Sequence, residues 1–163
     1  MKILHYLDEH FEEAVLVVLL SAMSIIIGVQ IFMRYVVQES LTWSEELARY
    51  LFIWVSYIGV SYAVKRHAHI RVEAAVMFMP PKVKKYVYIF SNVIFLVFAL
   101  MVVKEGFILS MKIFNFGQSS PAMGIPMGYV YLAPAVGFLL VFIRLIQSLI
   151  KNIKELNVKE EQK

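Results

Sequence analysis

The chain has 163 residues, of which 60% are hydrophobic and only 17% are charged. Soluble domains carry about 45–50% apolar and about 25% charged residues, so this composition excludes an ordinary water-soluble domain and indicates a membrane protein. The complete lack of cysteine excludes disulfide frameworks, iron–sulfur clusters and thiolate zinc sites.

The first predicted span covers residues 14–33, an uncharged run of 20 residues that ends at Arg34. About 20 apolar residues suffice for a helix to cross the hydrocarbon layer. Residues 2–13, in front of this run, carry four acidic residues against a single lysine, which is not the pattern of a secretory signal peptide. Their apolar residues recur at helical spacing, so we expect a short amphipathic helix that leads into the first span.

The second and third predicted spans cover residues 47–64 and 86–103. Between them, the apolar residues of 70–79 fit a strand as well as a helix. An isolated strand at a bilayer surface would leave its edges unpaired, so we expect an interfacial helix there. Residues 105–116 keep helical apolar spacing after the third span, and should extend it or lie along the membrane.

The fourth predicted span covers residues 125–143, and helical apolar spacing continues over 144–157, which should also extend the span or lie along the membrane. Pro126 lies near its start, where proline is tolerated. Pro134 lies in its interior, where the missing N–H should bend the helix. Residues 1–163 are therefore predicted to form a single membrane domain, an all-α integral membrane protein with four transmembrane helices and interfacial amphipathic segments.

Basic residues predict the topology. The connection between the second and third spans carries six basic residues against Glu73 alone. Since Lys and Arg stay on the cytoplasmic side, this connection and both termini should be cytoplasmic, with residues 34–46 and 104–124 outside.

Few residues of the predicted spans could carry chemistry. None is ionisable at mid-depth, and we expect the polar ones to hydrogen bond to neighbouring helices or to the backbone: Ser21, Ser24, Gln30, Ser56, Ser61, Ser91 and Asn92. All four histidines lie outside the spans, so a haem or metal site within the membrane has no histidine ligands. We therefore predict no enzymatic activity, cofactor, metal or substrate site. A self-sufficient homo-oligomeric channel or efflux protein is the alternative, and it would need an acidic residue within a span.

Polar residues gather at the start of the second span. There, Ser44 is predicted to cap the helix, and Glu45 is predicted to pair with Arg49 one turn later. Gly28, Gly59 and Gly137 are expected to allow close helix packing, within the chain or against another membrane subunit.

An ordered set of residues resembles a known family. It comprises Arg34-Tyr35, Trp43-Ser44-Glu45-Glu46, Arg49-Tyr50, Trp54, Gly59, His69-Ile70-Arg71-Val72, Pro80, Ser120-Pro121, Ile125-Pro126, Tyr131, Pro134 and Gly137. This set is similar to the small membrane (Q, or DctQ-like) subunit of tripartite ATP-independent periplasmic (TRAP) transporters.

The resemblance implies a four-helix subunit of the bacterial inner membrane that binds a large, multi-span transport subunit (M). The large subunit would hold the substrate and sodium sites. A periplasmic binding protein (P) would deliver an organic acid for symport, such as a C4-dicarboxylate, sialic acid or a sugar acid. The resemblance assigns structural or subunit-interface roles to its motif residues, and implies no catalytic role for them.

Overall fold

The computed structural model of this chain describes residues 2–66 and 80–160. The described residues form α1 (Lys2–Phe32), a π-helical extension η1 (Met33–Val37), α2 (Thr42–Lys65), α4 (Pro81–Asn115), α5 (Gly128–Tyr131) and α6 (Ala133–Glu160). They contain no β-strand, and a single antiparallel bridge joins Ser119 to Pro126. The predicted interfacial helix at 70–79, together with His69 and Arg71, lies outside the described residues.

Four helical stretches are long and apolar enough to cross a membrane, at residues 10–37, 42–65, 89–115 and 128–150. The predicted all-α fold with four spanning helices is therefore confirmed. The segments 2–13, 105–116 and 144–157 are almost wholly contained in the unbroken helices α1, α4 and α6.

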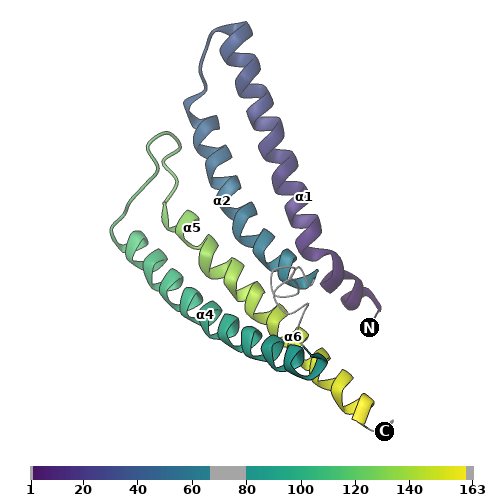
Figure 1. Cartoon of the computed structure of the whole chain (residues 1–163). Coiled ribbons are helices and arrows are strands. Elements are labelled where there is room, and N and C mark those ends of the chain that lie inside the picture. The colour runs from purple at the N-terminus through teal and green to yellow at the C-terminus, as the bar shows by residue number, and fades with distance from the viewer. Residues whose placement is uncertain (1, 67–79, 161–163) are drawn as a thin grey trace.

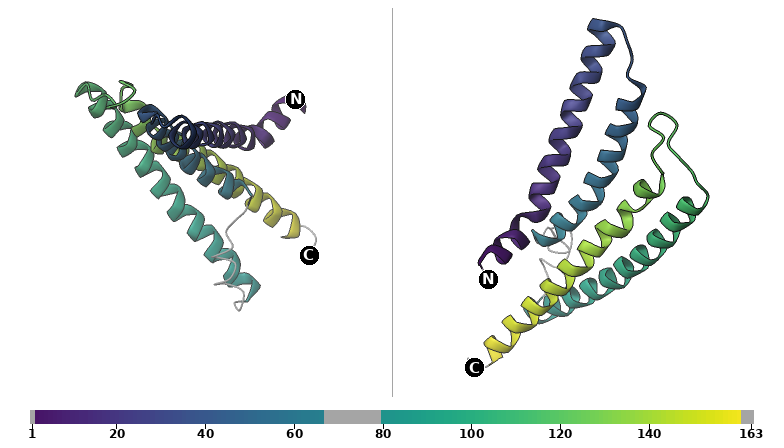
Figure 2. Two further views of the ribbon diagram at one scale, coloured as in Figure 1. Left: turned by 90° about the horizontal axis from the view of Figure 1, so that it is seen from above. Right: turned by 180° about the vertical axis from the view of Figure 1, so that it is seen from behind.

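The helices form two antiparallel pairs. Figure 1 shows α1 beside α2 and α4 beside α6, and Figure 2 places α2 and α6 between α1 and α4. Both chain termini lie at one end of the molecule, which we call the terminal end; it also holds the end of α2 and the start of α4 (Figure 1). The opposite end, with the connections 38–41 and 116–127, is called the loop end.

Close backbone approaches fix the inner helices. A Cβ atom at Gly137 of α6 would lie 2.6 Å from the Tyr57 Cβ and 2.8 Å from the Tyr57 carbonyl oxygen of α2. A Cβ atom at Gly106 of α4 would lie 3.2 Å from the Ala135 nitrogen of α6. Glycine is needed at Gly137 because a larger residue would push the helices apart, whereas a Cβ at Gly106 would make a tight contact.

The fourth span is interrupted where it was predicted to bend. The short helix α5 ends at Tyr131 and α6 begins at Ala133, so Pro134 stands in the first turn of α6 and not in a helix interior. Because Pro134 has no N–H, the carbonyl of Val130 cannot receive the usual helical bond. Pro126, which was placed inside the span, lies before it in the bridge with Ser119.

Candidate functional site: two buried carboxylates that join the helices

A buried carboxylate joins three helices at the terminal end. The Glu12 side chain on α1 has no exposed surface. Arg144 of α6 donates two hydrogen bonds to it, from Nε to Oε1 at 2.6 Å and from Nη2 to Oε2 at 2.9 Å. Lys65 Nζ, in the last turn of α2, lies 2.9 Å from Oε2, and the Ser61 hydroxyl lies 3.2 Å from Oε1. We call these four residues the Glu12 cluster.

The Glu12 cluster connects helices that otherwise stay apart. Among the described residues, no Cα atom of α1 comes within 8 Å of a Cα atom of α6. The long Arg144 side chain bridges this gap, and its Nη1 also donates to Gln147 Oε1 at 2.7 Å. A bidentate contact between a guanidinium and a carboxylate fixes both distance and orientation. The Glu12 cluster therefore fixes the position of α1 relative to α6.

Sequence patterns did not reveal this cluster. Glu12 precedes the predicted first span by two residues, and Arg144 follows the predicted fourth span by one, so both counted as flanking charges. The available signal was local: Arg144 stands between Ile143 and Leu145, inside an apolar pattern that continues after it. A charge in such a setting faces either a partner or water.

A second buried carboxylate holds the loop end. Glu46, in the first turns of α2, accepts a hydrogen bond from the Tyr50 hydroxyl and one from the Ala122 N–H at 2.9 Å. The Tyr50 oxygen also lies 3.1 Å from the Met127 sulfur. The Ser120 side chain lies beside Glu46 as well. We call these five residues the Glu46 cluster; it fastens the connection between α4 and α5 onto α2.

That connection is itself a tightly bonded hairpin. The Ser120 N–H donates to the Ile125 carbonyl at 2.8 Å, and the Gly124 N–H donates to the Ser120 carbonyl at 3.0 Å. Gly117 and Gly124 have φ values of 64° and 68°, which favour glycine because a Cβ would be strained there. The loop therefore has a defined shape before any partner arrives.

Two predictions at the start of α2 are wrong in detail. Ser44 does not cap the helix, which begins at Thr42 with Leu41 as its N-cap, and the Ser44 hydroxyl donates to the Leu41 carbonyl at 2.7 Å. Glu45 contacts α1 and not Arg49: its Oε1 accepts from Gln30 Nε2 at 2.7 Å and lies 3.9 Å from Arg34 Nη1. The connection 38–41 turns the chain back, so the end of α1 reaches Glu45.

The predicted motif residues thus fall into three groups. Glu46, Tyr50 and Ser120 meet in the Glu46 cluster, and Arg34 meets Glu45. Gly137 and Pro134 shape the packing and the start of α6. The others remain apart from these contacts: Tyr35, Trp43, Arg49 and Pro121 are exposed, Trp54 is half-buried, and Gly59 lies in the middle of α2 with open space where a Cβ would stand.

The described side chains hold no cluster of potential metal ligands. Among the side chains that the structure describes, no three of His, Cys, Asp or Glu gather closely enough to hold a metal ion. Among the side chains whose burial is described, the buried charged ones are Glu12, Glu46 and Arg144, and each is bonded to other groups of the same chain. Such contacts position helices and a loop.

Comparison with known proteins agrees with this architecture. A family model described as "Tripartite ATP-independent periplasmic transporters, DctQ component" matches residues 23–155. The isethionate TRAP transporter permease protein DctMQ of Oleidesulfovibrio alaskensis is 34% identical over 158 residues, which cover 93% of this chain and 25% of that protein. A putative TRAP transporter small permease protein of Haemophilus influenzae is 27% identical over 149 residues, or 91% of each chain.

A third relative is the sialic acid TRAP transporter permease protein SiaT of Haemophilus influenzae, which is 31% identical over 128 residues. This chain spans about a quarter of the length of DctMQ and a fifth of SiaT, whereas it spans nearly all of the small permease protein. Because the family model matches most of the sequence, this integral membrane protein belongs to the DctQ family of TRAP transporter components.

Proposed function

We propose that this chain is the small membrane subunit of a sodium-coupled, binding-protein-dependent TRAP transporter that imports an organic acid. In this role it pairs with a large multi-span permease subunit, and a periplasmic binding protein brings the substrate to the pair. The family match supports the role. The names of its relatives refer to isethionate, sialic acid, C4-dicarboxylate and ectoine, all small molecules with an acidic group.

One observation carries the proposal that the chain is a scaffold. A membrane site for an organic anion needs an available cation or an oriented helix end. The buried cation among the described residues, Arg144, is bonded to Glu12 and Gln147, and the two buried carboxylates are bonded as well. Lys104 and Glu105 on α4, 3.7 Å apart, are both exposed at the surface. Substrate and sodium are therefore assigned to the large subunit.

The free helix faces support pairing with another membrane subunit. Nothing lies within 4 Å of a Cβ placed at Gly28 of α1 or at Gly59 of α2, whereas Gly106 and Gly137 are used within the chain. Small residues allow a partner helix to approach closely. In lipid, the burial of apolar surface gives little driving force for helix association, so close packing becomes important. We assign Gly28 and Gly59 to contacts with the large subunit.

The loop end is proposed to face the periplasm, and the terminal end, with both chain termini, the cytoplasm. Lys65 and Arg66 at the end of α2, and Lys82, Lys84 and Lys85 in the first turns of α4, give the terminal end its positive charge. The ordered hairpin 116–127 and the exposed Trp43 are then available for docking of the binding protein.

Copurification tests the pairing. The tagged chain should retain the large subunit of the same transporter through detergent extraction and gel filtration. Gly28→Leu and Gly59→Leu should weaken this complex without changing the thermal stability of the chain alone, because both positions are open. A chain that conducts ions alone in liposomes and leaves the large subunit unbound would favour the channel alternative.

A further inference from the structure

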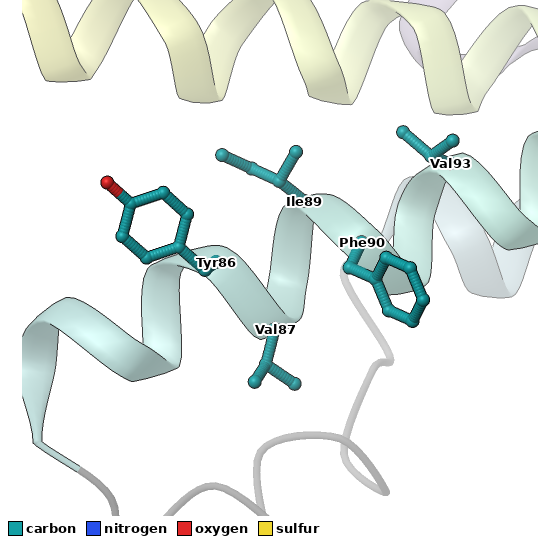
Figure 3. A pocket seen from close by; sticks show the side chains of 5 residues that line it. All are labelled: Tyr86, Val87, Ile89, Phe90 and Val93. Carbon is teal, nitrogen blue, oxygen red and sulfur yellow. The ribbon is translucent and has the colours of Figure 1, made fainter.

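An apolar hollow lies beside the first turns of α4, at the terminal end. It has a volume of about 520 Å³ and is lined by Tyr86, Val87, Ile89, Phe90 and Val93 (Figure 3). Four of these residues, at positions 86, 89, 90 and 93, share one face of the helix. Figure 3 shows Ile89 and Val93 pointing toward α6 and Val87 pointing the opposite way. The described lining is hydrocarbon apart from the Tyr86 hydroxyl.

The hollow crosses the edge of the apolar span. The uncharged run of α4 begins at Tyr86, directly after Lys85, so Tyr86 lies at the edge of the apolar part of the helix, and Ile89, Phe90 and Val93 lie within it. Tyrosine is enriched at the level of lipid headgroups, where its ring is buried and its hydroxyl is hydrated. The hollow therefore runs from headgroup level into the hydrocarbon.

Three lysines directly precede the hollow in the sequence. Lys82, Lys84 and Lys85 occupy the first turns of α4, and the sequence from 81 to 93 has no acidic residue. Arg66, at the end of α2, is exposed at the same end and pairs there with Glu13 at 3.4 Å. Lysines at a membrane surface attract anionic lipids.

A ligand that satisfies both features must have a hydrocarbon chain and a negative headgroup. A soluble anion would gain nothing from the apolar lining, and a zwitterionic lipid would gain little from the three lysines. We propose that the hollow holds an acyl chain of an anionic phospholipid whose phosphate lies beside the first turns of α4. This lipid fills the space next to α6 and fastens the start of α4 at the membrane surface.

Native mass spectrometry of the purified full-length chain tests this site. Phosphatidylglycerol and phosphatidylcholine with the same acyl chains are added in turn, and bound lipids are counted. The wild-type chain should retain one phosphatidylglycerol in preference to phosphatidylcholine. Val93→Trp, which fills the hollow, should lose this bound lipid. The control Val97→Trp, on an exposed position one turn later, should keep it.

A second variant leaves the helix packing intact. Changing Lys82, Lys84 and Lys85 together to Gln should reduce the preference for phosphatidylglycerol about tenfold or more. Changing Lys104 and Lys112, farther along α4, to Gln should leave it unchanged. Equal binding of both lipids by the wild-type chain would overturn the proposal. The proposal would also be overturned if Val93→Trp bound the lipid as well as the wild-type chain does. If the wild-type chain retained no lipid, protein would fill the hollow and the proposal would be wrong.

Discussion

Replacing Glu12 by Gln is expected to loosen the attachment of α1 to the rest of the chain. The amide keeps the shape of the carboxylate but removes its charge, and its NH₂ group would face the donors of Arg144 or Lys65. Three charge-assisted contacts, at 2.6, 2.9 and 2.9 Å, are weakened at once. Removing one partner from a buried ion pair costs about 3–5 kcal/mol, because the remaining charge stays buried without compensation.

Thermal unfolding of the purified chain in detergent measures this loss. In soluble domains of this size, a loss of about 3–5 kcal/mol in the free energy of unfolding lowers Tm by about 6–20 °C. Glu13→Gln is the matched control, because Glu13 is 43% exposed and its contact with Arg66 is 3.4 Å long. Exposed ion pairs contribute little to the free energy of unfolding, so the Glu13→Gln control should unfold close to the wild-type temperature.

A double-mutant cycle then isolates the contact between α1 and α6. Arg144→Gln alone should also destabilise the chain. The double variant with Glu12→Gln should lose less unfolding free energy than the two single variants lose together. Equal effects of Glu12→Gln and Glu13→Gln, or additive losses in the cycle, would refute the assignment of the Glu12 cluster as the link between these helices.

The remaining predictions concern packing, the loop end and topology. Gly137→Ala should cost about 1–3 kcal/mol of unfolding free energy, because its Cβ would meet the Tyr57 backbone, whereas Gly59→Ala should cost nothing in the chain alone; equal denaturation curves would contradict this. Glu46→Gln should speed hydrogen exchange of the Ala122 amide, while Glu45→Gln should not, and unchanged exchange would show that Glu46 does not hold the loop. In double-mutant cycles, Glu45 should couple to Gln30 and not to Arg49. Cysteines placed at Glu39 and Gln118 should react with an impermeant reagent from outside, and a cysteine at Lys84 should not; the reverse pattern would invert the topology.

The number and type of spanning helices could be predicted because long apolar runs and helical spacing are local properties of the sequence. The break before Pro134 follows from its missing N–H, although the sequence does not show that α6 starts one residue earlier. Glu12 and Arg144 could not be paired in this way, since 132 positions separate them and only the fold brings them together.

The loop end shows the same limit. Glu46 and Tyr50 were recognised as motif residues, but their contact with the hairpin at Ala122 depends on tertiary structure. The expected pair of Glu45 and Arg49 relied on helical spacing alone. Gln30 and Arg34 compete for Glu45 because the end of α1 lies beside the start of α2, and a pattern within one helix cannot include such a neighbour.

We propose that this chain supports transport without binding the transported molecule. Liposomes containing the large subunit, with the binding protein and labelled organic acid added under a sodium gradient, test it most directly. Uptake should require this chain, and substituting its Ser24 and Ser56 by Ala should leave substrate preference unchanged. Full uptake without the chain, or an altered preference in those variants, would contradict the claim.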